Sequence, residues 1–174
     1  ADKSNDIRLV FLININIGYI DLMTKQFDRA YKLFAYLDKL NKTSPMLDGE
    51  VYYQYNSFLG EFYYHFGRLD LAEKYSFISS DFFKDYNIKG HLKSESRLVY
   101  IRYLRDGFID KEEIYKVINK YRESKIAHGE RLFILKMAKL ALINSDLELS
   151  KLLIEIYDSL ETKVDSNVIN TNEK

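Results

Sequence analysis

The chemistry open to this chain depends on a small set of titratable side chains. Its three histidines, His65, His91 and His128, are far apart in the sequence, and none belongs to the H-E-x-x-H pattern that holds zinc on one face of a helix. Glu61 lies four residues before His65, a spacing that a solvent-facing helix also favours. The chain contains no cysteine, which excludes a thiolate nucleophile and a thiolate metal site.

Other signatures of catalysis are missing as well. The sequence has no G-x-G-x-x-G, Walker or G-x-S-x-G motif. Asp110, Glu112 and Glu113 form an acidic group, but they stand at an expected helix start, where the helix dipole stabilises negative charge. We therefore expect no enzymatic activity, no metal site and no bound cofactor.

The elements that must position these side chains are expected to be helices. The chain has 174 residues, of which 47% are hydrophobic and only one is proline. Pro45 interrupts one helical stretch and Gly67 suits the end of another. Asp110 with Glu113 is an acidic variant of the capping box, and Asp146 is an expected N-cap after a turn. Periodicity and these signals predict eight helices, at about residues 7–24, 27–41, 49–66, 70–86, 91–105, 111–123, 127–143 and 147–161.

The expected helices make one domain over residues 1–161. In its first helix, the stripe predicted to face the core consists of Ile7, Val10, Phe11, Asn14, Ile17, Gly18 and Ile20. Residues 162–174 are mostly polar, with two valines and one isoleucine, and we expect them to form a disordered tail or linker.

Two segments of the chain repeat the same spacing of small residues. Gly60 lies twelve residues before Ala72, and Gly18 lies twelve residues before Ala30, so the pattern recurs with a period of 42 residues. A fixed period of this length is typical of helical repeat arrays, in which small residues let paired helices approach closely.

The segment from Leu59 to Ala72 resembles a tetratricopeptide repeat, with the pattern L-G-x-x-Y followed by G-x-L-x-x-A. The segment from Ile17 to Phe34 resembles a second copy, in which Asp21 replaces the tyrosine. Two degenerate copies fit around Tyr100 and around Ala138, although Tyr100 is too large for a small-residue position. The resemblance covers about residues 7–161. It implies an all-α fold in which about four antiparallel helix pairs stack as a right-handed α-solenoid.

The resemblance also implies a concave surface made by the first helix of each pair. Its polar centre would bind an extended or helical peptide, with basic side chains receiving an acidic group. The residues expected there are Tyr19, Gln54, Ser57, Glu61, Tyr64, His65, Arg97, Arg105 and Lys139. Apolar ends are expected at Leu12, Ile15, Leu22 and Met23 and at Leu132, Leu135, Leu142 and Ile143. In the alternative interpretation, neighbouring helices or a further repeat cover these apolar ends.

We expect a protein- or peptide-binding scaffold. Long repeats rich in Asn, Tyr, Lys and Ile resemble the sensor and docking regions of bacterial regulators, including peptide-pheromone receptors. The absence of cysteine does not determine the redox compartment, and a cytoplasmic location is the default expectation. A structural module that self-associates is the first alternative. The second is a nucleic-acid binder that uses the basic segment 84–139, although its basic residues are spread rather than clustered. No apolar run is long enough for a membrane span.

Overall fold

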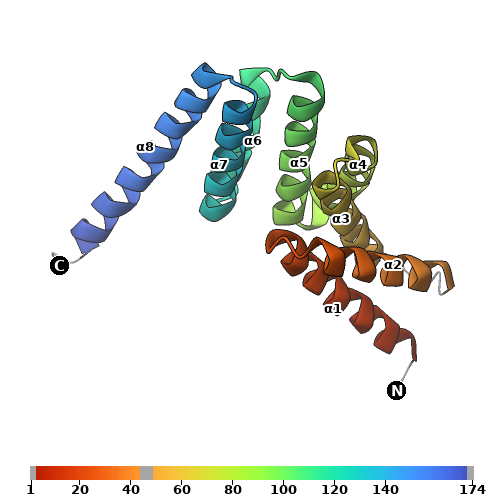
Figure 1. Cartoon of the computed structure of the whole chain (residues 1–174). Helices are drawn as coiled ribbons and strands as arrows, with labels where there is room; N and C mark the ends of the chain where they lie inside the picture. The colour runs from red at the N-terminus through yellow and green to blue at the C-terminus, as the bar shows by residue number, and fades with distance from the viewer. Residues whose placement is uncertain (1–2, 44–48, 172–174) are drawn as a thin grey trace. The chain divides into compact units, whose positions relative to one another are not determined.

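A computed structural model describes the backbone of residues 3–43 and 49–171 and the side chains of residues 7–43 and 49–160 (Figure 1). Within these ranges the protein is all-α, with eight helices and no strand. The helices are α1 (Lys3–Met23), α2 (Phe27–Thr43), α3 (Gly49–His65), α4 (Leu69–Tyr86), α5 (Ile88–Asp106), α6 (Lys111–Glu123), α7 (Ala127–Ile143) and α8 (Leu147–Thr171). The predicted all-α class and the predicted number of helices are thus confirmed.

Three helix boundaries differ from the prediction by three residues or more. α1 begins at Lys3 and not at about residue 7. The other two differences have local reasons. α5 begins at Ile88 because the side chain of Asn87 caps it, its Oδ1 accepting a hydrogen bond from the backbone N–H of Gly90 at 3.0 Å. α8 continues to Thr171, so the expected tail is helical from residue 162 to that point. No glycine or proline occurs between Leu147 and Thr171 to end the helix earlier. Residues 172–174 lie outside the described residues.

The chain divides into two compact units, which are described separately. Unit 1 spans Ala1–Ile101 and unit 2 spans Arg102–Lys174, so the division falls inside α5. In unit 1, α1 packs on α2 and α3, and α3 packs on α4. In unit 2, α7 packs on both α6 and α8.

One type of turn joins the consecutive helices that pack together. Its central residue has a positive φ, which is 61° at Lys25, 70° at Gly67, 56° at Lys125 and 61° at Ser145. The backbone N–H of Gly67 donates to Tyr64 O at 3.2 Å, and that of Arg68 donates to Tyr63 O at 2.9 Å. This pair of hydrogen bonds defines a Schellman motif. The other three turns make the equivalent two bonds. The structure therefore confirms the helix end predicted at Gly67.

These turns give a stability prediction, because Lys125 adopts a backbone conformation that favours glycine. Lys125→Gly is expected to raise the free energy of unfolding by about 0.5–1 kcal/mol, the relief of strain exceeding the added entropy of the unfolded chain. Gly67→Lys, the reverse change in the same motif, is expected to lower it by a similar amount. Urea denaturation measures both, and a lower midpoint for Lys125→Gly would contradict the assigned turn geometry.

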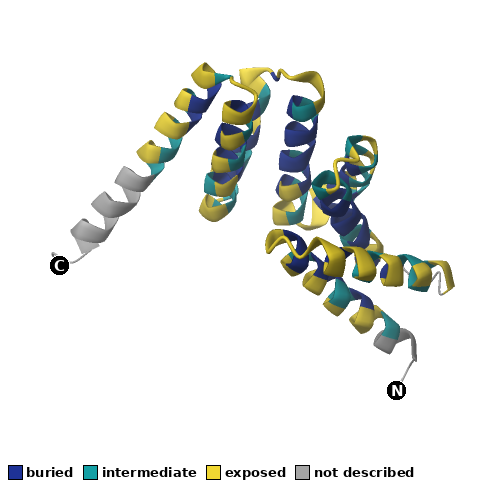
Figure 2. Cartoon of the chain, viewed as in Figure 1, coloured by how far each residue is buried: buried dark blue, intermediate teal, exposed yellow. Residues whose placement is uncertain are grey.

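The core of unit 1 is rich in aromatic side chains. Figure 2 shows the buried positions of the helices in dark blue. Phe34 of α2 stacks on Phe62 of α3 with ring centroids 4.4 Å apart, and Phe11 of α1 meets Tyr55 of α3 edge to face at 5.6 Å. The fully buried members of the core include Phe11, Ala30, Leu37 and Phe58. Aromatic pairs across three helices thus supply much of the apolar contact that holds unit 1 together.

Two glycines of unit 1, Gly18 and Gly60, lie where neighbours approach closely. A Cβ on Gly60 would lie 3.2 Å from the backbone nitrogen of Ser76 in α4, so Gly60 is at the crossing of α3 and α4 as expected. A Cβ on Gly18 would lie 2.5 Å from the ring of Phe58 in α3, and 3.3 Å from Leu33 in α2. The main effect of Gly18 is therefore to leave space for the ring of Phe58 from α3. Its effect on the approach of α1 and α2 is smaller.

α1 buries a face that differs from the predicted stripe. Phe11, Ile15, Gly18 and Leu22 are buried, whereas Ile17 is exposed. Val10 and Ile20, also predicted to face the core, are exposed too. The prediction was wrong because residues 9–20 carry no charge, so the apolar period does not distinguish one face of this helix from another.

Unit 2 has its own apolar core and two capped helices. Ile118 of α6, Phe133 of α7 and Leu153 of α8 are all buried. Asp110 caps α6 by accepting a hydrogen bond from the N–H of Glu112 at 3.0 Å, and Asp146 caps α8 through the N–H of Leu149 at 3.1 Å. Both predicted N-caps are thus confirmed. The predicted partner in the capping box, Glu113, instead binds Arg102, with Nη1 to carboxylate distances of 3.0 and 3.1 Å.

Candidate functional site

Six of the nine residues expected on the concave surface come together in unit 1. We call them the polar cluster, which consists of Tyr19, Ser57, Glu61, Tyr64, His65 and Arg97. Tyr19 extends from α1 and Arg97 from α5. The other four residues follow one another along α3 at spacings of four, three and one, which places them on one face of that helix. The sequence therefore identified residues that lie close together, although they come from three helices.

Arg97 is the centre of the polar cluster and is almost fully buried, with 2% of its side chain exposed. Its Nη2 and Nε donate to Glu61 Oε2 at 2.7 and 3.1 Å. Its Nη1 donates to the backbone carbonyl of Ser57 at 3.1 Å and to Ser76 Oγ of α4 at 3.2 Å. One guanidinium group therefore connects α5 to both α3 and α4.

The remaining members of the polar cluster surround this ion pair. His65 Nε2 lies 3.3 Å from Glu61 Oε1, so both carboxylate oxygens have a nitrogen close by. The hydroxyl of Tyr19 donates to Ser57 Oγ at 3.0 Å. Burial raises the pKa of Tyr19 to about 12 against the opposing effect of nearby Arg97. Burial and the charge of Glu61 likewise raise the pKa of Tyr64 to about 12. Both phenols are therefore neutral at physiological pH.

This geometry changes the role expected for three of the residues. Ser57, Glu61 and Arg97 are buried and bonded to one another, so they do not form an open polar floor for a peptide. Removing one partner of such a pair leaves an uncompensated buried charge. These three residues therefore tie α3 to α5 inside unit 1.

Small polar residues next to the polar cluster are the signal that reasoning from the sequence missed. Ser76, Ser79 and Ser94 are completely buried, and Ser79 Oγ lies 2.9 Å from Ser94 Oγ, which joins α4 to α5. Serines at these positions permit close packing and satisfy buried polar atoms. Such serines indicate a polar contact between helices. A contact of this kind can also satisfy the hydrogen-bond donors of a buried arginine.

The other three predicted site residues lie outside the polar cluster. Gln54 bonds to Glu50 within α3, at 2.9 Å. Arg105 and Lys139 belong to unit 2. Arg105 Nε donates to Asp106 Oδ1 at 2.9 Å, and this hydrogen bond lowers the pKa of the Asp106 carboxyl. Lys139 is exposed on α7.

Lys139 is part of an exposed apolar face, which we call the α7 stripe. It comprises Leu132, Leu135, Lys139, Leu142 and Ile143, all of which the sequence placed on the concave surface. The four apolar side chains are exposed by 39%, 44%, 59% and 64% in chain order. The opposite face of α7, including Phe133 and Met137, is buried against its neighbours in unit 2. The α7 stripe is therefore a part of the predicted surface in which all five residues are exposed.

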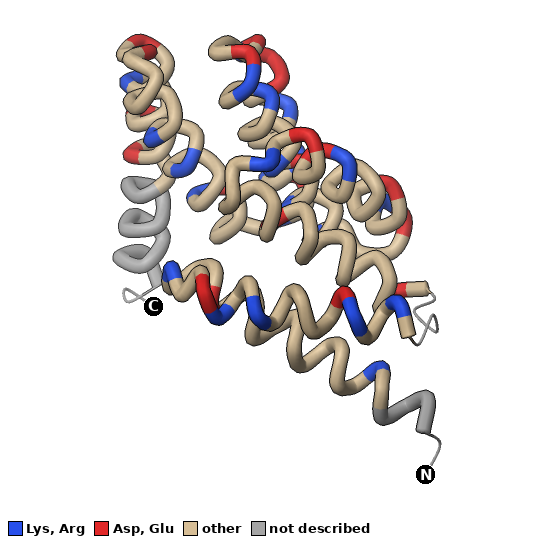
Figure 3. Tube along the Cα trace, turned by 45° about the vertical axis from the view of Figure 1, so that its right-hand side comes forward, with Lys and Arg blue, Asp and Glu red and all other residues tan. Residues whose placement is uncertain are grey.

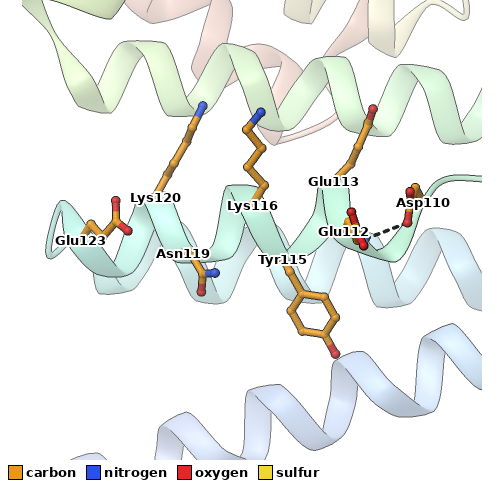
Figure 4. Close-up of a pocket in the computed structure, with 8 residues that line it drawn as sticks. All are labelled: Asp110, Glu112, Glu113, Tyr115, Lys116, Asn119, Lys120 and Glu123. Atoms are coloured by element: carbon orange, nitrogen blue, oxygen red, sulfur yellow. Dashed lines mark hydrogen bonds between the residues drawn. The ribbon is translucent and has the colours of Figure 1, made fainter.

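An open hollow lies along α6 (Figure 4). Its lining residues are Asp110, Glu112, Glu113, Tyr115, Lys116, Asn119, Lys120 and Glu123, which all come from α6 and its N-cap. Lys116, Lys120 and Glu113 extend to one side of the helix, whereas Tyr115 extends to the other. This mixed-charge surface of a single helix lacks the convergent apolar walls typical of a small-molecule site.

The chain matches no protein-family model, and no curated protein or solved structure shows significant similarity to it. Over the part of the chain that the structure describes, no group of three or more His, Asp or Glu side chains is placed to hold a metal ion. No helix in that part combines the length and apolar character needed to cross a bilayer.

Proposed function

We propose that this protein is a non-catalytic scaffold that binds an amphipathic helix or peptide of a partner protein along the α7 stripe. The observation that carries the proposal is the exposure of four large aliphatic side chains on one face of α7. Contiguous exposed apolar surface of this kind marks interaction sites in soluble proteins.

The spacing of the α7 stripe suits a helical partner. Its residues recur at intervals of three, four, three and one, so they form one continuous line along the helix. Amphipathic helices dock on such lines through their own anchors at positions i, i+3, i+4 and i+7. Lys139 lies midway along the α7 stripe and favours a partner with an acidic side chain beside its apolar anchors.

The same proposal includes the architecture. We propose that the helices are tetratricopeptide-like pairs, stacked as an α-solenoid. Support comes from the recurrence of two features at 42-residue intervals, the small residues Gly18 and Gly60 and the Schellman turns at Lys25 and Gly67. The resemblance of such long repeats to bacterial regulators favours a sensory or docking role in signalling.

Selection of binding peptides from a library of amphipathic helices tests the proposed site. Peptides selected on the wild-type chain are expected to bind Leu142→Asp at least about tenfold more weakly, because a charge then replaces an apolar anchor. Lys139→Glu is expected to weaken binding of acidic peptides in particular. Isothermal titration calorimetry measures both effects.

Phe77→Asp provides the matched control, since Phe77 is an equally exposed apolar residue, at 64%, on α4 of unit 1. Its affinity for the selected peptides is expected to equal that of the wild type. Weaker binding by Phe77→Asp together with unchanged binding by Leu142→Asp would place the binding surface elsewhere.

A further inference from the structure

The outer face of α1 carries apolar side chains, although it is exposed to solvent. Leu9, Ile13, Ile20 and Met23 are exposed by 58%, 49%, 61% and 57%. A surface helix normally carries polar or charged residues on its outer face. Here no charged residue occurs between Leu9 and Ile20, as the uninterrupted tan stretch of α1 shows (Figure 3).

These residues follow a heptad pattern. Leu9, Ile13, Asn16, Ile20 and Met23 are separated by four, three, four and three residues, and all five are exposed. We call this line the α1 seam. Alternating spacings of three and four place side chains on the contact line between two packed helices, and the α1 seam is therefore shaped to pack against another helix.

We propose that α1 packs antiparallel against α1 of a second copy of this chain, with a two-fold axis at Asn16. In this register Leu9 faces Met23 of the other copy, and Ile13 lies beside Ile20, offset by one residue along the helix. Asn16 faces its own counterpart, and because an amide group both donates and accepts hydrogen bonds, two asparagines satisfy each other. A two-fold contact requires a surface that is complementary to itself, and the α1 seam meets that requirement.

Charge and area also favour a second copy. The absence of charge from Leu9 to Ile20 means that two identical faces meet without repulsion between like charges. Val10 and Ile17 flank the α1 seam and are each 38% exposed, which gives six large apolar side chains in each copy. Taking roughly 100 Å² of apolar surface for each large side chain, each copy contributes on the order of 600 Å² and the dimer covers on the order of 1,200 Å². That area lies at the lower limit of specific interfaces, so the dimer is expected to dissociate on dilution.

Sedimentation velocity of the full chain over about a hundredfold range of concentration tests the association. The wild type is expected to shift from monomer to dimer. Ile13→Glu alone and Ile20→Lys alone are each expected to weaken the dimer at least about tenfold, while the double variant regains association because each introduced carboxylate faces an introduced ammonium group. Phe77→Glu, which is equally exposed on α4, is expected to dimerise like the wild type.

Cysteine cross-linking tests the register, since the natural chain has no cysteine. Asn16→Cys is expected to form a disulfide-linked dimer on mild oxidation, because the residue meets its own counterpart. Leu9→Cys is expected to cross-link with Met23→Cys in a mixture and not with itself. Self-linking of Leu9→Cys would overturn the antiparallel arrangement, and a monomer at every concentration would overturn the dimer. A monomer that still binds peptides through the α7 stripe would leave the proposed function intact.

Discussion

Arg97→Ala is expected to lower the free energy of unfolding by about 3–5 kcal/mol, the cost of removing the guanidinium group from beside a buried carboxylate. The side chain of Glu61 is only 7% exposed, so water does not replace the lost guanidinium. The change also leaves Ser76 and the carbonyl of Ser57 without their bonds to Arg97. Chemical denaturation monitored by circular dichroism measures the loss.

Two further variants separate the ion pair from simple packing. Replacing both partners, as Glu61→Leu with Arg97→Met, is expected to recover much of the stability because no charge then remains buried. Lys139→Ala, a change at an exposed basic residue, is expected to stay within about 0.5 kcal/mol of the wild type. Stability of Arg97→Ala equal to that of Lys139→Ala would show that Arg97 is solvated and not buried.

Gly60→Leu is expected to destabilise unit 1 by about 3 kcal/mol or more, because overpacking affects a helix crossing and the ion pair together. Even a Cβ at this position would lie 2.6 Å from Arg97 Nη1 and 3.2 Å from the backbone nitrogen of Ser76. The arginine side chain can shift, but the backbone of α4 moves only if α3 and α4 separate.

Lys74→Leu is the control for this change, since it adds a leucine to an exposed position of α4. Its unfolding midpoint is expected to stay close to that of the wild type. A melting temperature for Gly60→Leu that matches the control would show that α3 and α4 do not approach at Gly60, and the helix-pair assignment would lose its main support.

Most of the helices were predictable because local signals specify where helices begin and end. Gly67 and Asp146 end or begin helices through their own backbone or side-chain bonds, which short sequence patterns reveal. The helix cap at Asn87 was not predicted. It is the same kind of signal, because its side chain accepts a hydrogen bond from the N–H of Gly90 three residues later. The stripe on α1 was not predictable, because no face of that helix carries a charge between residues 9 and 20.

The sequence predicted that the residues of the polar cluster lie on one surface, but not which of them contact one another. Arg97 and Glu61 are 36 residues apart, and periodicity placed both on helix faces without showing that those faces meet. A charged residue on a helix is usually solvated, and only a partner from another helix makes burial possible. For the α7 stripe, the predicted face and the exposed face agree, since the opposite side of α7 carries the residues that its neighbours bury.

The most direct test of the binding site is the map of amide chemical-shift changes when a selected amphipathic peptide is added to the isotope-labelled chain. The account predicts that the largest changes fall on residues 132–143 of α7, with little change from Gln54 to His65 of α3. The largest changes on α3, with α7 unaffected, would show that the polar cluster opens to bind the peptide and would contradict the assignment of the α7 stripe as the binding surface.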